Sequence, residues 1–175
     1  MSHLGAATPI ADVVALSRRL AEFGWHLQIH CEAALIPELA PHLRQSAVPV
    51  VIDHMGRIDA SLGIDQPAFH ALRQLLEDER MWVKVSGSER SSRQPLPYED
   101  AIPFAARLVA DVPQRVLWGT DWPHPNLAGE PPDDGHLVDL LEQIAPSSAA
   151  RQALLVDNPL RLYRFGDSAA AGGSS

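Results

Sequence analysis

Apolar residues along the chain follow two spacings, one typical of helices and the other of short buried strands. Over 10–23 the apolar side chains recur every three or four positions, with arginine and glutamate between them, which predicts an amphipathic helix. The stretches 48–52, 81–85 and 116–120 are short and mostly apolar, like the buried strands of a parallel sheet. The stretch 25–30 alternates and predicts one more short strand.

Helical spacing fills the segments between and after these strands. Further helices are expected over 32–46, 66–78, 99–110, 136–145 and 148–156, with a last turn over 160–165. Pro37 and Pro41 interrupt the first of these segments early. A strand followed by a helix, repeated along the chain, predicts an α/β fold with parallel strands and right-handed crossovers.

Composition narrows the class of protein. A length of 175 residues suits one domain, and a net charge of -8 without a cluster of basic residues argues against nucleic acid or an anionic membrane as a partner. A single cysteine, Cys31, rules out an internal disulfide and fits a reducing compartment. We find no membrane-spanning run and no signal peptide, so we expect a cytoplasmic protein. Residues 167–175 are small and polar, and we expect a disordered tail there.

Each expected strand ends in a polar residue. These residues are His30, His54, Ser86 and Asp121. Because the carboxyl ends of parallel strands lie on one side of a sheet, residues far apart in sequence would converge there in one cleft. Solvation alone also places polar residues at strand ends, so the pattern favours a functional site without requiring one.

An aspartate and a histidine facing one another at such an edge allow two kinds of chemistry. Asp121 and His54 could act as general base and electrophilic partner, or as two ligands of a divalent metal such as zinc. A zinc site needs three or four protein ligands, and His30 is the candidate third. The residues alone leave this choice open. We find no glycine-rich phosphate loop, and Ser86 is too isolated to be read as a nucleophile.

Other side chains near these strand ends are candidate substrate contacts. Arg90 follows the third strand, and its planar guanidinium matches a carboxylate or a developing oxyanion. Arg93 is better explained as solvated surface. His124 lies between two prolines, three residues after Asp121, and we interpret it as a loop or substrate contact rather than a metal ligand, with a purely structural role as the alternative.

Four strings in this order resemble a known family. VVIDHMGR, WVKVSGSER, VLWGTDWPHP and VDNPLRLYRF together are similar to the amidohydrolase-related TIM-barrel hydrolases, especially the 2-pyrone-4,6-dicarboxylate lactonase group, and the similarity runs from about His3 to Phe165. The resemblance implies a (β/α)₈ barrel that hydrolyses a small carboxylated lactone without a metal cofactor.

The resemblance also implies roles for individual residues. Asp121 would be the general base that activates water, His54 would polarise the scissile carbonyl, and Arg90 would bind a substrate carboxylate. His30 would line the substrate cavity, with His124 as a further contact. If a metal-dependent hydrolase or decarboxylase of the same superfamily is the better match, His54 and Asp121 become metal ligands.

The chain also departs from this family. Members begin with a strand that carries a His-x-His pair and add two more strand-helix units, none of which is present here. A complete barrel has about 250 residues and eight strands. We therefore expect a partial (β/α)₈ barrel of about four C-terminal strand-helix units over 1–166, inactive as given.

An incomplete barrel would expose part of its sheet. Open sheet edges and an uncovered apolar face that includes parts of Val50, Ile52, Val83, Val85 and Leu117 would favour self-association or a complementing N-terminal half. The alternative to an incomplete enzyme is a non-catalytic fragment that associates through these edges.

Overall fold

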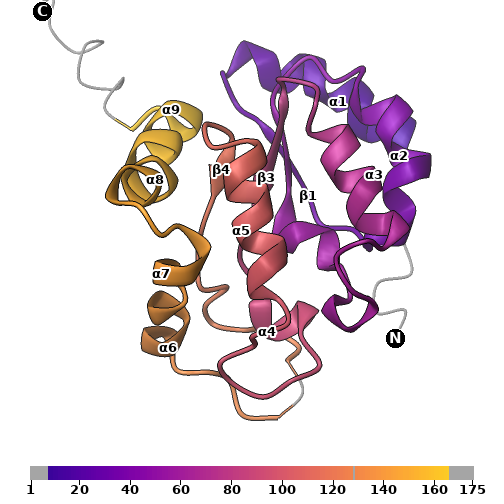
Figure 1. Ribbon diagram of the computed structural model, residues 1–175. Coiled ribbons are helices and arrows are strands. Elements are labelled where there is room, and N and C mark those ends of the chain that lie inside the picture. The colour runs from indigo at the N-terminus through magenta and orange to yellow at the C-terminus, as the bar shows by residue number, and fades with distance from the viewer. Residues whose placement is uncertain (1–7, 128, 166–175) are drawn as a thin grey trace, which may run out of the picture.

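The computed structural model describes residues 8–127 and 129–165, which form a four-stranded parallel sheet with helices packed against it (Figure 1). The strands are β1 (Leu27–Ile29), β2 (Val50–Ile52), β3 (Met81–Lys84) and β4 (Val116–Leu117), paired in that order. The α/β class and the parallel pairing are confirmed. The tail expected over 167–175 lies outside the described residues.

The strands are shorter than their apolar runs. β4 ends at Leu117 because Leu117 pairs with Lys84, the last residue of β3, so Trp118 has no ladder partner in this pair. At its start, β2 follows Pro49, which has no N–H to give to the ladder but whose carbonyl accepts from Leu27 N. Pairing, rather than the apolar run, therefore sets where each strand stops.

Short helices connect and follow the strands. They are α1 (Ile10–Glu22), α2 (Ile36–Leu43), α3 (Pro67–Leu75), α4 (Ser88–Ser91), α5 (Ile102–Asp111), α6 (Asp134–Asp139), α7 (Leu141–Ile144), α8 (Ser148–Gln152) and α9 (Asn158–Tyr163). Three 3₁₀ turns, η1 (Ala33–Leu35), η2 (Asp53–Arg57) and η3 (Ala60–Leu62), and one π turn, η4 (Ala153–Asp157), complete the set. Within the described part of the chain, no helix is both long and apolar enough to span a membrane.

Two of these helices differ from the expectation. α4 begins four positions after β3 ends and is absent from the expected helices, because four residues are too few to show a helical period. Pro41 lies inside α2 rather than breaking it, while the 3₁₀ turn η1 takes up the first part of the expected helix. α4 and η1 both contact η2, the turn at the carboxyl end of β2.

The two faces of the sheet are covered differently. Val50, Ile52 and Val83 are fully buried in the main core together with Phe69, Phe104 and other helix side chains. On the opposite face, Val51, Trp82 and Leu117 form a small separate cluster with Leu162 of α9. Successive strand residues point to opposite faces, so these two sets belong to the two sides of the sheet.

The expectation that Val50, Ile52, Val83, Val85 and Leu117 would lack a covering layer is wrong. The four β-branched residues are all 0% exposed within the helix-facing core, and Leu117 is 1% exposed. Leu117 lies on the opposite face and is covered by Leu162 of α9, so neither face lacks a covering layer at these residues. Helices α1 to α3 lie beside β1 and β2, while α9 packs on β4 (Figure 1).

Candidate active site

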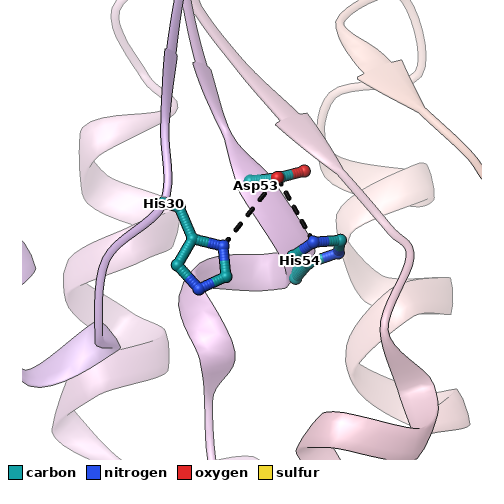
Figure 2. A group of neighbouring side chains, drawn as sticks. All are labelled: His30, Asp53 and His54. Carbon is teal, nitrogen blue, oxygen red and sulfur yellow. Dashed lines mark ion pairs between the residues drawn. The ribbon is translucent and has the colours of Figure 1, made fainter. Parts of the chain in front are cut away.

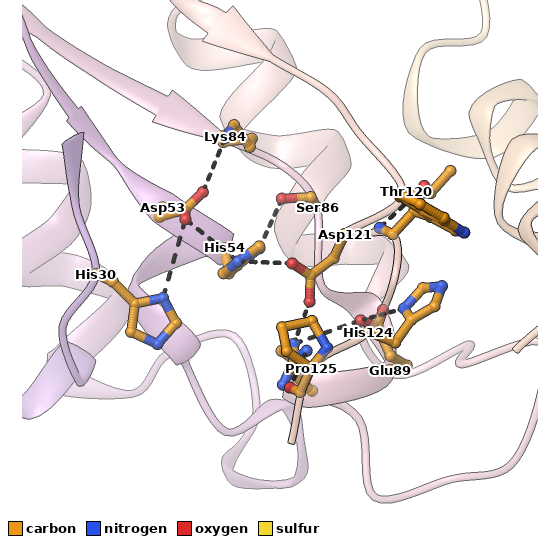
Figure 3. A network of polar contacts seen from close by, with 12 residues as sticks. His30, Asp53, His54, Lys84, Ser86, Glu89, Thr120, Asp121, His124 and Pro125 are labelled. Atoms are coloured by element: carbon orange, nitrogen blue, oxygen red, sulfur yellow. Dashed lines mark hydrogen bonds and ion pairs between the residues drawn. The ribbon is translucent and has the colours of Figure 1, made fainter. Parts of the chain in front are cut away.

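Polar side chains from all four strand ends meet at one edge of the sheet (Figure 3). His54 lies at the centre of this network and comes directly after Asp53, the residue that follows β2. Its ring Nε2 is 3.2 Å from Asp121 Oδ1 and 3.2 Å from Asp53 Oδ2. The prediction that Asp121 and His54 meet on one face of the sheet is confirmed by this distance.

The backbone at both residues is left-handed. His54 has φ 47° and Asp121 has φ 69°, values that residues other than glycine adopt rarely and at some cost in conformational energy. Met55 and Gly56 share this conformation, so the chain turns sharply as soon as β2 ends. Gly87 packs closely against this turn: if it carried a Cβ, that atom would lie only 3.0 Å from His54 Cβ. His54 therefore has little room to move toward Gly87. The fold thus holds the imidazole by its backbone as well as by its hydrogen bonds.

The two ring nitrogens of His54 have different partners. Nδ1 lies 2.8 Å from Ser86 Oγ, and Nε2 faces the two carboxylates. Burial is the largest influence on this group and lowers its pKa, while Asp53 and Asp121 act in the opposite direction. A neutral ring with its proton on Nε2 satisfies this arrangement, since the Ser86 hydroxyl can donate to Nδ1 and Nε2–H can donate to a carboxylate or a substrate carbonyl.

Asp53, which follows β2, contacts side chains from β1 and β3. Gln28 Nε2 donates to its Oδ2 at 3.0 Å, and Lys84 Nζ lies 3.2 Å from its Oδ1. His30 Nδ1 is more distant, at 3.9 Å from Oδ2, and its side chain is 51% exposed (Figure 2). Asp53 therefore ties β1, β2 and β3 together below His54, while His30 lies at the open side of the site.

Arg90 is the direct partner of Asp121. Its Nε donates to Asp121 Oδ2, and its Nη2 donates to the carbonyl of Pro125 at 2.9 Å. The Arg90 side chain is 12% exposed and that of Asp121 13%. Arg93, by contrast, points outward and pairs with Asp59, with 69% of its side chain exposed. The expectation that Arg90 lies at the strand ends and Arg93 at the surface agrees with these positions.

His124 lies behind Asp121 rather than in the open part of the site. Its ring is 3% exposed, with Nδ1 3.6 Å from Glu89 Oε1 and Nε2 3.1 Å from Asp134 Oδ1. Glu89 is also buried, and burial raises the pKa of its carboxyl group. A direct contact between His124 and substrate has no support from this position.

Sequence reasoning missed three members of the network. Asp53 occurs in the sequence analysis only within VVIDHMGR, and Glu89 and Lys84 only within WVKVSGSER. Lys84 could have been found, because a lysine inside the apolar strand 81–85 must point to the face away from the helices. Ser86 was noticed but set aside as a nucleophile, and with 2% exposure it is poorly placed to attack a substrate.

Two groups of side chains place potential metal ligands within 4.8 Å of one another: His30, Asp53 and His54, and Glu89, Asp121 and His124. The expected metal pair, His54 and Asp121, is thus divided between them. In the first group, His54 Nδ1 already pairs with Ser86 and Asp53 Oδ2 accepts from Gln28. These bonds leave His54 Nε2 free, so they do not by themselves exclude a metal from the first group. Lys84 Nζ, 3.2 Å from Asp53 Oδ1, places a positive charge beside this group.

Comparison with known proteins shows which family the chain belongs to. Residues 3–165 match the amidohydrolase family. The chain is 45% identical over 165 residues to the 2-pyrone-4,6-dicarboxylate hydrolase of Comamonas testosteroni, covering 89% of this chain and 54% of that protein. It is 43% identical over 144 residues to the 4-sulfomuconolactone hydrolase of Hydrogenophaga intermedia, covering 81% and 48%.

A solved structure shows the same arrangement of elements. The crystal structure of a protein from Agrobacterium tumefaciens, without ligand, is similar with a TM-score of 0.80 and 30% identity, over 94% of this chain and 60% of that one. Because the match covers 94% of this chain but only 60% of the solved structure, this chain corresponds to a partial barrel. The chain therefore belongs to the amidohydrolase family, and it spans about half the length of the curated relatives it matches.

Proposed function

We propose that this chain carries the water-activating half of a hydrolase for small carboxylated lactones, such as 2-pyrone-4,6-dicarboxylate. The observation that carries the proposal is the contact of His54 Nε2 with Asp121 Oδ1, 3.2 Å apart beside Arg90. A base, a hydrogen-bond donor and a guanidinium then face one position at the carboxyl ends of the strands.

The reaction would use these groups in order. Asp121 takes a proton from water, and the hydroxide oxygen bonds to the lactone carbonyl carbon while His54 Nε2–H donates to the carbonyl oxygen. The bond from that carbon to the ring oxygen then breaks, and the leaving oxygen takes the proton held by Asp121. Water and lactone give a ring-opened acid, with no other reactant.

Arg90 would bind the substrate carboxylate. Its Nε is engaged by Asp121 and its Nη2 by Pro125, so a substrate carboxylate has to share or replace the Asp121 contact. Such an exchange would free an Asp121 oxygen for water at the moment when substrate arrives. His30, exposed at the edge of the network, would line the cavity on the opposite side of His54.

Hydrolysis in this proposal needs no metal, because the nitrogens of His54 and the oxygens of Asp121 already have protein partners. The metal-dependent alternative assigns zinc to His54 and Asp121. We also propose that the protein is located in the cytoplasm. Since the chain spans about half of its relatives, the complete activity requires the remainder of the barrel, supplied as an extension or as a separate half.

The test is a lactonase assay on the chain completed in this way. Asp121→Asn should lower kcat by about 10²- to 10⁴-fold with little change in KM, because the amide keeps the shape but cannot accept the proton. Asp65→Asn, the same change at an exposed position, is the matched control. A chelator should leave the rate unchanged. Reversible loss on chelation would favour the metal-dependent alternative, and full activity in Asp121→Asn would contradict the proposal.

A further inference from the structure

A buried pair of side chains behind Asp121 contains acceptor atoms without donors (Figure 3). Glu89 lies in α4 and His124 lies in the loop after β4, with side chains 1% and 3% exposed. Both carboxylate oxygens of Glu89 and the Nδ1 of His124 are buried without a hydrogen-bond partner among the described residues. Buried polar atoms are nearly always paired, so these three atoms call for an explanation.

The contact of His124 with Asp134 determines where the ring proton lies. Nε2 is 3.1 Å from Asp134 Oδ1, and because a carboxylate only accepts, Nε2 is the donor. In a ring with one proton, Nδ1 is then an acceptor, and it faces Glu89 Oε1 at 3.6 Å. Two acceptors directed at each other repel, whereas one proton between them turns the contact into a hydrogen bond.

The surroundings of Glu89 favour its carboxyl group as the owner of this proton. Burial is the largest influence on the pKa of Glu89 and raises it. Arg90 could offset a negative charge on Glu89, but its Nε donates to Asp121 and lies farther away, 3.6 Å, from Glu89 Oε1. The charge of Asp121 also disfavours a second carboxylate nearby. A carboxyl group in such a site stays protonated at neutral pH and donates a hydrogen bond.

Glu89 and Arg90 are neighbours in α4, and both hold the turn that follows β4. Arg90 donates to the Asp121 carboxylate and to the carbonyl of Pro125, while Glu89 faces the ring of His124. Within the turn, His124 N donates to Asp121 O at 2.7 Å. Asp121 and His124 have φ of 69° and 57°, a conformation that persists only when the surrounding contacts determine it.

From this geometry we propose that Glu89 is a neutral carboxylic acid that donates its proton to His124 Nδ1 and thereby positions Asp121. The proton lets Oε1 and Nδ1 approach from 3.6 Å to the about 3 Å of a hydrogen bond. Burial closes both side chains to substrate, so they are positioning residues rather than catalytic ones. The effect on the general base rests on the proposed function, whereas the protonation of Glu89 does not.

Infrared spectroscopy of the 175-residue chain at neutral pH tests the protonation. We expect the carbonyl band of a protonated carboxyl group in the parent chain and its loss in Glu89→Gln. Glu142→Gln, the same change at an exposed position of α7, is the matched control and should keep the band. Labelling of the glutamate carboxyl carbons with ¹³C should shift the band, which assigns it to a glutamate without any substitution. A parent chain without the band, or a band that survives in Glu89→Gln, would overturn the proposal.

Kinetics of the completed enzyme test the positioning. Glu89→Leu removes the donor and should lower kcat by about 10-fold with a smaller change in KM, because Asp121 is less well placed. Glu89→Gln should restore most of that rate, since its amide N–H donates to His124 Nδ1 as the acid does. Equal losses in the two variants, or a full rate in Glu89→Leu, would overturn the positioning role. The infrared measurement uses no substrate, so a completed parent enzyme without lactone hydrolysis would count against the proposed function alone.

Discussion

Ser86 Oγ lies 2.8 Å from His54 Nδ1, although the two residues follow different strands and are 32 positions apart. Because Nε2 faces the carboxylates of Asp53 and Asp121, which accept hydrogen bonds, a neutral ring carries its proton on Nε2, and the Ser86 hydroxyl then donates to Nδ1. In the proposed reaction, Ser86 would act through His54 as a positioning residue rather than as a nucleophile.

Loss of this hydroxyl should disturb the reaction without disturbing substrate binding. In the completed enzyme, Ser86→Ala should lower kcat by about 10-fold with KM nearly unchanged, because the ring becomes free to turn or change tautomer. Ser86→Thr, which keeps the hydroxyl, should recover part of the rate. Ser91→Ala is the matched control, since Ser91 Oγ is buried without a partner. Equal losses in both alanine variants would mean that Ser86 matters only for packing.

Arg90 and Arg93 offer a matched pair of arginines. Arg90→Ala should raise KM for a dicarboxylated lactone by about 10-fold or more, because the guanidinium that would bind the carboxylate is gone. Arg93→Ala should leave KM and kcat unchanged, since Arg93 pairs with Asp59 at the surface. Steady-state kinetics of the completed enzyme measure both. An unchanged KM in Arg90→Ala would mean that Arg90 serves Asp121 alone.

The elements at the strand ends could be located from sequence because periodicity and chain direction determine them. His54, Asp121 and Arg90 each follow an apolar run, and parallel pairing brings such ends together. The contacts behind them could not be located in this way. Glu89 meets His124 only because β3 and β4 are neighbours and because Asp121 and His124 both adopt positive φ, which no periodicity reveals. The burial of Val50 and Ile52 was misjudged, because both faces of these strands are apolar and alternation does not show which side chains the helices cover.

His54 should make stability depend on pH. Burial lowers its pKa in the folded chain, whereas an unfolded histidine titrates near about 6.5. Below that value the unfolded state binds more protons than the folded state, so the free energy of unfolding should fall as pH falls from about 7.5 to about 5.5. His26 shifts in the same direction, also mainly through burial, so the two must be separated.

A difference measurement separates them. Urea unfolding of the chain and of His54→Gln at both pH values should show a smaller loss of stability in the variant, because only the His54 contribution has been removed. Parallel losses in the two proteins would assign the pH dependence to other groups and would contradict a neutral His54 in the folded state.

The two edges of the sheet differ in a way that decides how the chain as given should associate. β4 is partly covered, because Asn158 Nδ2 donates to Val116 O at 2.8 Å and to Pro113 O at 2.9 Å, and Asn158 is 1% exposed. β1 is the opposite edge of this sheet and pairs on one side with β2. Since Leu27 N donates toward β2, the N–H of Gln28 points the other way and is open to another strand.

We therefore predict that the 175-residue chain self-associates through β1 and does not hydrolyse 2-pyrone-4,6-dicarboxylate. Size-exclusion chromatography with light scattering should give a mass above 19.1 kDa, and a lactonase assay on the same sample should show no turnover. Gln28→Pro should shift the chain toward monomer, because proline removes the outward N–H. Gln28→Ala, which loses the same bond to Asp53 but keeps that N–H, should associate like the parent chain. If both variants and the parent are well-folded monomers, β1 does not drive association, and turnover by such a monomer would show that half of the barrel is sufficient for catalysis.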